Sequence, residues 1–127
     1  MPKKKVLLCL TGASGAIYGQ KALQLLKKMK HEVHLIISKW GEKTLEHELD
    51  KKAEDLRKEA DYTYEEDDLA AGPASGSFHI DSMLIAPCSM KTLAGIAHGY
   101  ADNLIARAAD CALKERRPLV LVVRETP

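Results

Sequence analysis

The stretch Val6-Leu7-Leu8-Cys9-Leu10 runs directly into Thr11-Gly12-Ala13-Ser14-Gly15. Five apolar residues are too few for a signal peptide or a membrane span, but they suit a strand that is buried on both faces. The small residues after it predict a turn, and a helical pattern of apolar and lysine residues then continues to Met29. The apolar face of this helix is expected to consist of Tyr18, Ala22, Leu25, Leu26 and Met29.

Apolar runs of strand length and helical segments alternate along the rest of the chain. Strands are expected at Val33–Ile37, at Met83–Ala86 with Pro87 closing it, and at Leu119–Val123 in the core. Helices are expected from Lys39 to about Asp50, from Cys88 through His98 and from Leu104 to Ala112. This alternation requires parallel pairing with right-handed crossovers. We therefore predict one α/β domain over residues 1–127, a doubly wound, Rossmann-like (flavodoxin-like) three-layer αβα sandwich.

Two segments between these elements have a different composition. Residues 50–68 are highly charged and predict an exposed surface element, with Tyr62–Tyr64 as a possible short edge strand. Gly72–Ser77 is rich in small residues and is too short for a domain linker, which makes it a candidate active-site loop.

Composition excludes several functional classes. The 19 Lys and Arg balance 18 Asp and Glu to a net charge of +1, so we expect neither a nucleic-acid nor a membrane partner. Three cysteines without a CxxC spacing predict reduced thiols in the cytoplasm. Five histidines show no ligand spacing, so no metal site is expected.

Unusual residues gather at the predicted carboxyl ends of the strands, where ligands of such sheets bind. They are the glycine turn at Gly12–Gly15, then Ser38, then Ser89–Thr92, and finally Arg124. A glycine turn before a helix suits phosphate recognition, and a guanidinium directly after a buried strand needs an anion. The second strand ends without the acidic residue that a dinucleotide site requires, so a mononucleotide, FMN, is favoured over NAD. Alternatively, Ser38 and Ser89 serve only as helix N-caps.

Several long motifs in this order resemble the UbiX/Pad-type flavin prenyltransferases, a family formerly called aromatic-acid decarboxylases. They are Thr11–Gly19, Gly72–Ser77, Pro87–Ala97, Asp102–Asp110 and Leu113–Pro127. The resemblance runs from end to end of the chain. It implies transfer of a dimethylallyl group from dimethylallyl phosphate to reduced FMN, without a metal.

The resemblance also implies roles for individual residues. Ser14 and Glu48 are similar in position to the proton-handling pair of the family, although Glu48 on its own would be interpreted as a solvent-facing carboxylate. The residues implied around FMN are Gly12, Ala13, Ser14, Ser38, Ser89, Met90, Lys91, Thr92 and Arg124.

Partners follow from the same resemblance. It implies a homo-oligomer, a dodecamer in the family, whose prenylated flavin is passed to a UbiD-type decarboxylase. An apolar surface around Ala94–Ala109 is expected to pack on neighbouring copies. The family continues for about another third of its length beyond Arg124-Glu125-Thr126-Pro127, so we expect the C-terminal part of the family domain, and with it part of the donor site, to be absent.

Two other functions stay open. One is an FMN-dependent decarboxylase that acts on cysteine-containing peptides, although such proteins carry a different motif after the third strand. The other is a non-catalytic FMN-binding subunit.

Overall fold

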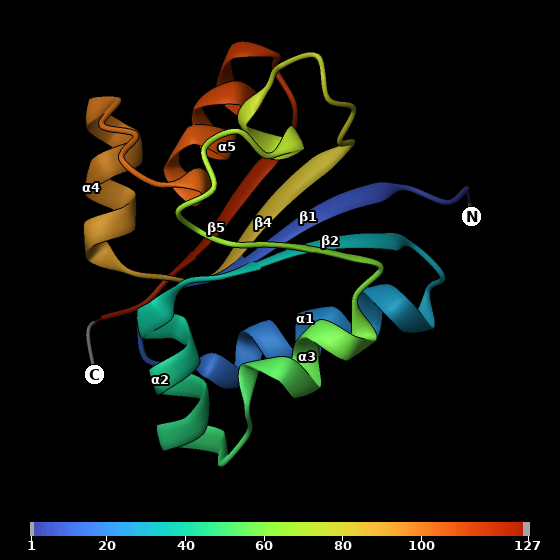
Figure 1. Cartoon of the computed structure of the whole chain (residues 1–127), viewed down its shortest axis with the longest axis vertical. Coiled ribbons are helices and arrows are strands. Elements are labelled where there is room, and N and C mark those ends of the chain that lie inside the picture. The colour runs from blue at the N-terminus through green and yellow to red at the C-terminus, as the bar shows by residue number, and fades with distance from the viewer. Residues whose placement is uncertain (1, 126–127) are drawn as a thin grey trace.

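A computed structural model describes residues 2–125, and its centre is a five-stranded, fully parallel sheet (Figure 1). The strand order is β3-β2-β1-β4-β5, the Rossmann order, and it confirms the predicted α/β fold class. The strands are β1 (Lys5–Leu10), β2 (Glu32–Ile37), β3 (Tyr62–Tyr64), β4 (Ser82–Cys88) and β5 (Leu119–Val123).

Helices cover both faces of the sheet. The helices below the sheet in Figure 1 are α1 (Ala16–Lys28), α2 (Lys39–Leu49) and α3 (Ala53–Glu59), and those above it are α4 (Met90–His98) and α5 (Leu104–Lys114). A short 3-10 turn, η1 (Gly72–Ala74), packs against α5. Successive side chains of β1 point to opposite faces, so Leu8 and Leu10 pack toward α1 while Leu7 and Cys9 pack toward α5.

Helix α1 buries a different face from the one predicted. Ala16, Gly19 and Leu23 are buried, whereas Leu25 is 58% exposed. Of the predicted face, Tyr18 and Met29 are also exposed, and only Ala22 and Leu26 contact the core. The reason is Gly19, where a Cβ atom would lie 2.5 Å from the carbonyl oxygen of Ala86. The side that carries Gly19 is therefore the side that packs on the sheet.

The two leucines of α1 allow a matched test of this face. We expect Leu23→Ala to lower the free energy of unfolding by about 2–5 kcal/mol, because it removes a fully buried side chain. Leu25→Ala on the exposed side should change it by about 0.5 kcal/mol or less. Urea denaturation measures both; equal losses would show that the helix is rotated from the orientation described.

Other expectations need correction. The charged segment after residue 50 contains α3, which buries Ala53 and Leu56 and is not a purely exposed element. Strand β4 continues through Pro87 to Cys88, and its pairing with β5 is irregular between Ile85 and Cys88. The predicted edge strand at Tyr62–Tyr64 is confirmed.

The last strand and the alanine-rich surface also differ from expectation. Strand β5 is the other edge of the sheet and is only partly buried, so it is not a core strand. Helix α5 buries Ala106, Ala108 and Ala109 within its own chain, whereas α4 has no buried residue. The open parts of the predicted surface are α4 and the turn after it, where Tyr100 is 67% exposed.

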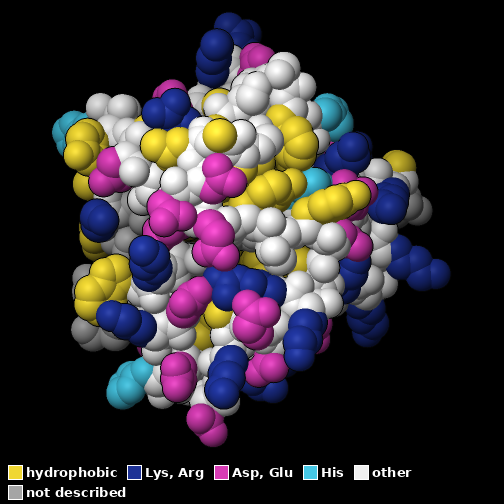
Figure 2. Space-filling view, viewed as in Figure 1, with side chains coloured by type: hydrophobic (Ala, Val, Ile, Leu, Met, Phe, Trp, Pro, Cys, Tyr) yellow, Lys and Arg dark blue, Asp and Glu magenta, His cyan; other side chains and the backbone are white. Residues whose placement is uncertain are grey.

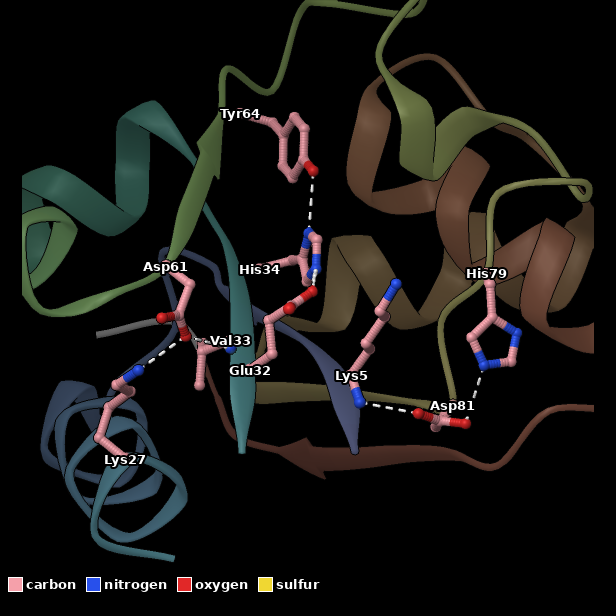
Figure 3. A network of polar contacts seen from close by, with 9 residues as sticks. All are labelled: Lys5, Lys27, Glu32, Val33, His34, Asp61, Tyr64, His79 and Asp81. Atoms are coloured by element: carbon pink, nitrogen blue, oxygen red, sulfur yellow. Dashed lines mark hydrogen bonds and ion pairs between the residues drawn. The ribbon is translucent and has the colours of Figure 1, made fainter. Parts of the chain in front are cut away.

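A network of side chains ties the amino ends of the strands together (Figure 3). Asp61 accepts hydrogen bonds from Lys27 Nζ and from the backbone N–H of Val33, both at 2.7 Å. Partial burial opposes the ionisation of Asp61, but these hydrogen bonds outweigh it and hold its pKa below the ordinary value. At the start of β1, Asp81 accepts a hydrogen bond from the backbone N–H of Lys5 at 2.7 Å.

The buried ring of His34 occupies the middle of this network. Its Nδ1 lies 2.8 Å from the Tyr64 hydroxyl and its Nε2 lies 2.7 Å from a Glu32 carboxylate oxygen. Burial, then Tyr62 and Glu32, raise the pKa of Tyr64, so its hydroxyl stays protonated at neutral pH. The contacts of His34 fasten the short edge strand β3 to β2.

Charges of both signs are mixed on the visible surface. On the face shown in Figure 2, Lys and Arg side chains alternate with Asp and Glu side chains. Within residues 2–125, no helix has both the length and the apolar character needed to cross a bilayer.

Candidate functional site

The carboxyl ends of β1 and β4 are held together by one buried side chain. The Thr11 hydroxyl donates to the carbonyl oxygen of Pro87 at 2.7 Å and accepts the backbone N–H of Ser89 at 2.8 Å. The chain leaves β1 toward α1 on one face and leaves β4 toward α4 on the other, so this is the point where the winding of the sheet reverses. Sheets of this kind bind ligands at that point.

Removing the Thr11 hydroxyl should test this junction. Thr11→Val keeps the shape of the side chain but leaves the Ser89 N–H without its acceptor, so we expect a loss of about 1–3 kcal/mol in the free energy of unfolding. The control is Thr63→Val on the exposed edge strand, which should change it by about 0.5 kcal/mol or less. If Thr11→Val and the native chain have the same midpoint in chemical denaturation, the hydrogen bonds of the Thr11 hydroxyl do not contribute to stability.

Three helix N-termini meet beside this junction. Ser38 caps α2 by accepting the Gly41 N–H, Ser89 caps α4 by accepting the Thr92 N–H, and Asn103 caps α5 by accepting the Ala106 N–H. The N-cap interpretation of Ser38 and Ser89 is therefore correct for their local bonding. Each helix directs the positive end of its dipole toward the same space.

This space is a cavity of about 460 Å³, a size typical of small-molecule sites. Five of the predicted cofactor-binding residues line it, which are Gly12, Ser38, Ser89, Lys91 and Thr92. The remaining lining residues are Thr11, Trp40, Lys43, Thr44, His47, Glu66, Asn103 and Ile105.

The other predicted cofactor residues lie outside the cavity wall. Ala13 is fully buried, Met90 is 49% exposed, and Ser14 is half-buried on the glycine turn. Arg124 is exposed, and its guanidinium carbon lies 5.2 Å from the centre of the Tyr18 ring. Burial therefore does not force Arg124 onto an anion, contrary to expectation, because β5 is an edge strand.

The glycine turn makes its close contacts within the protein. A Cβ on Gly12 would lie 2.5 Å from Trp40 Cβ, so this glycine lets α2 begin directly against the turn. Gly15 has a φ of 95°, a conformation that disfavours side chains. The backbone N–H of Ser14 donates to the carbonyl oxygen of Glu125 at 2.9 Å, which places Ser14 beside the chain that leaves β5.

Glu48 occupies the N-terminus of α1. One of its carboxylate oxygens accepts the backbone N–H groups of Gly15 and Ala16, both at 3.0 Å. The anion that the glycine turn binds is therefore the protein's own Glu48, and the expected phosphate position at α1 is taken. The Glu48 carboxylate thus binds the backbone of Gly15, the residue that directly follows Ser14 in the sequence.

The candidate active-site loop does not line the cavity of a single chain. Residues 72–77 precede β4 and pack on α5, where Arg117 donates to the carbonyl oxygen of Gly76 at 2.7 Å. A thiol hydrogen bond from Cys111 to Ala74 adds to this contact. The loop thus lies toward the amino end of β4, away from Ser89.

Sequence reasoning missed one face of α2. Trp40, Lys43, Thr44 and His47 line the cavity with spacings of three, one and three residues, which is one side of a helix. The helical spacing of these four residues is visible in the sequence. A helix face that lines a cavity and one that faces solvent can share this spacing, so the sequence does not distinguish them.

Glu66 was also missed. Its carboxylate accepts the backbone N–H of Lys39 at 2.7 Å, and its carbonyl oxygen accepts the N–H of Leu104 at 2.6 Å. This residue connects the first turns of α2 and α5 at the cavity.

The buried thiol of Cys88 directly precedes Ser89 of the cavity wall. All three cysteines are free, and burial raises the pKa of Cys88 to about 11, so this thiol is protonated at neutral pH. In residues 2–125, no group of three or more His, Cys, Asp or Glu is arranged to hold a metal ion.

The lining residues suit a phosphate ester carrying a larger organic group. Helix N-termini, the hydroxyls of Ser38 and Thr92, and the Lys91 ammonium are donors that phosphate oxygens require. Trp40 and Ile105 add large apolar side chains to the wall. FMN, which joins one phosphate to a flat ring system, fits this set of residues.

Comparisons with known proteins agree with this geometry. A family model described as Flavoprotein matches residues 1–127. A curated Bacillus subtilis protein, "Probable UbiX-like flavin prenyltransferase", is 50% identical over 125 residues, which cover 98% of this chain and 61% of that protein. The chain spans 61–66% of the length of the first curated relatives that it matches.

Two solved structures share the fold closely. One is AnUbiX (PadA1) in complex with FMN and dimethylallyl pyrophosphate, with a TM-score of 0.95 and 48% identity over 99% of this chain and 67% of that chain. The other is a dodecameric FMN-dependent UbiX-like decarboxylase from Escherichia coli O157:H7, with a TM-score of 0.93 and 51% identity over 97% of this chain and 68% of that chain.

Proposed function

Because this chain belongs to the Flavoprotein family, among its UbiX-like flavin prenyltransferases, we propose that it transfers a dimethylallyl group from dimethylallyl phosphate to reduced FMN. The observation that carries the proposal is the cavity at which three capped helix N-termini converge, in a chain 48% identical to a protein solved with FMN and dimethylallyl pyrophosphate. Ser38, Ser89 and Thr92 would hold the FMN phosphate, with Lys91 adding positive charge.

The two residues that we propose to handle protons are Ser14, on the glycine turn, and Glu48, on α2. When bound in its reduced form, FMN supplies the ring atoms N5 and C6 that accept the five-carbon unit. Glu48 is held in place by the N–H groups of Gly15 and Ala16, and Ser14 immediately precedes Gly15. We propose that the Glu48 carboxylate, fixed on the N–H group of the residue that follows Ser14, receives a proton and returns it together with the Ser14 hydroxyl.

Substitution of these two residues tests the role. We expect Ser14→Ala and Glu48→Gln each to keep FMN bound but to lower the prenylation rate by roughly 10²- to 10⁴-fold, the usual span for an acid–base group. Glu46→Gln, on an exposed position of the same helix, is the control and should react at the native rate. The rate is measured as flavin carrying an added five-carbon unit, detected by mass spectrometry. A Glu48→Gln protein that reacts normally would remove Glu48 from the mechanism.

The same assay separates the alternative functions. The chain is incubated with reduced FMN and either dimethylallyl phosphate or dimethylallyl pyrophosphate, because the donor of the related structure is the pyrophosphate. Release of carbon dioxide from a cysteine-containing peptide, without prenylated flavin, would identify the decarboxylase alternative. FMN binding without either product would identify a non-catalytic FMN-binding subunit. Tighter binding of NAD than of FMN in equilibrium dialysis would reject all three FMN-dependent functions.

We also propose a homo-oligomer that delivers its product to a UbiD-type decarboxylase in the cytoplasm. Helix α4 supports the assembly, because it has no buried residue in the single chain and because Met90, Ala94 and Ala97 leave an exposed apolar side on it. The related Escherichia coli O157:H7 structure is described as dodecameric.

A charge placed on α4 should test the assembly. We expect light scattering to give a multiple of the 14.0 kDa chain mass, and Ala94→Glu on the open side of α4 to reduce it. Lys114→Glu, an exposed substitution on α5, serves as the control and should leave the mass unchanged. A monomeric mass with FMN bound would contradict the proposal.

A further inference from the structure

Trp40 is the only tryptophan of the chain, and it lies on the wall of the cavity while remaining 67% exposed. Among the residues that the structure describes, no Phe, Tyr or other Trp lines this cavity. An indole is the side chain that gains most from burial and from stacking on another ring. Its exposure at the edge of a concave site therefore indicates a ring-bearing partner.

The backbone of Trp40 is held from several sides. Gly12 packs against its Cβ, its carbonyl oxygen accepts the Thr44 hydroxyl at 2.9 Å, and the next residue, Gly41, is tied to Ser38. A side chain on such a fixed base is positioned before any ligand arrives. This lowers the entropy cost of using it as a binding surface.

The orientation of the indole is restricted by Lys43. The Lys43 ammonium lies over the ring, 4.3 Å from its centre, one helical turn after Trp40. A cation over one face is a favourable contact, and it leaves the opposite face for a flat ligand.

The order of groups along the cavity matches the order of groups in FMN. Ser38 is buried at the helix N-termini, where the proposed function places the phosphate, and the exposed Trp40 follows it by two residues on the cavity wall. In FMN a ribityl chain separates the phosphate from the flat ring system. A phosphate at the helix N-termini therefore sends the ring system past the wall that carries Trp40.

From this arrangement we infer that Trp40 stacks on the flavin ring system and positions it in the cavity. The inference rests on the proposed function, because it requires FMN as the ligand. Trp40 is a positioning residue in this account, since it offers no group that moves a proton.

The experiment compares three variants for FMN binding by equilibrium dialysis. Trp40→Leu removes the ring and should weaken FMN binding by about 5- to 30-fold, which corresponds to about 1–2 kcal/mol. Trp40→Phe keeps a smaller ring and should retain most of the affinity. Tyr100→Leu is the matched control, because Tyr100 is also 67% exposed but lines only a neighbouring cavity.

A second readout separates stacking from general packing. An indole stacked on flavin quenches flavin emission by electron transfer, so emission from bound FMN should be weak in the native protein and stronger in Trp40→Leu. Tyr100→Leu should leave it unchanged. Light scattering of each variant shows whether Trp40 acts at a subunit contact instead.

The outcomes distinguish this inference from the proposed function. If the native chain binds no FMN, the proposed function itself fails. If FMN binds equally to the native chain and to Trp40→Leu, with the same flavin emission, Trp40 does not stack on the ring and the inference is overturned. A changed mass with unchanged FMN affinity would equally overturn it and would assign Trp40 to an interface.

Discussion

The hydroxyl of Thr11 connects two strand ends that lie 76 residues apart in the chain, and the position of the cavity depends on it. Strand β1 supplies the glycine turn and β4 supplies Ser89, so both walls begin at the residues that this hydroxyl joins. A buried hydroxyl that both donates and accepts leaves no polar group of the junction unpaired. Ser38 is joined to the same place by its N–H, which donates to Leu10.

The amino ends and the carboxyl ends of the strands carry different kinds of polar group. At the amino ends, carboxylates such as Asp61 and Asp81 satisfy backbone N–H groups and neighbouring cations. At the carboxyl ends, helix N-termini face a space that is large enough for a ligand. Substitutions at the amino ends are therefore expected to change the free energy of unfolding. Substitutions at the carboxyl ends are expected to change ligand binding as well.

Most of the fold could be predicted because buried parallel strands leave continuous apolar runs in the sequence. The exceptions have physical reasons. Helix α3 contributes only Ala53 and Leu56 to the core, so its charged residues dominated the pattern. The prediction for α1 was wrong because its apolar residues fit two overlapping helix faces. The close contact of Gly19 with the sheet decides that the face with Leu23 is the buried one.

The cavity lining could be predicted where a residue directly follows a strand. Ser38 and Ser89 follow directly from the rule that ligands bind at carboxyl ends, and both line the cavity. His47 and Asn103 could not be found in this way, because they reach the cavity through the packing of α2 and α5. The role of Glu48 as the cap of α1 joins two helices that the sequence presents as separate.

The contact between Gly12 and Trp40 limits how this pocket can change during evolution. Any residue larger than glycine at position 12 would push the first turn of α2 away, since its Cβ would lie 2.5 Å from that of Trp40. Such a shift would move Ser38 as well, because it caps the same helix. The positions of Ser38 and Trp40 are thus linked through the first turn of α2. A lineage that reshapes one of them for a new ligand must alter the other in the same step, and this favours paired substitutions over single ones.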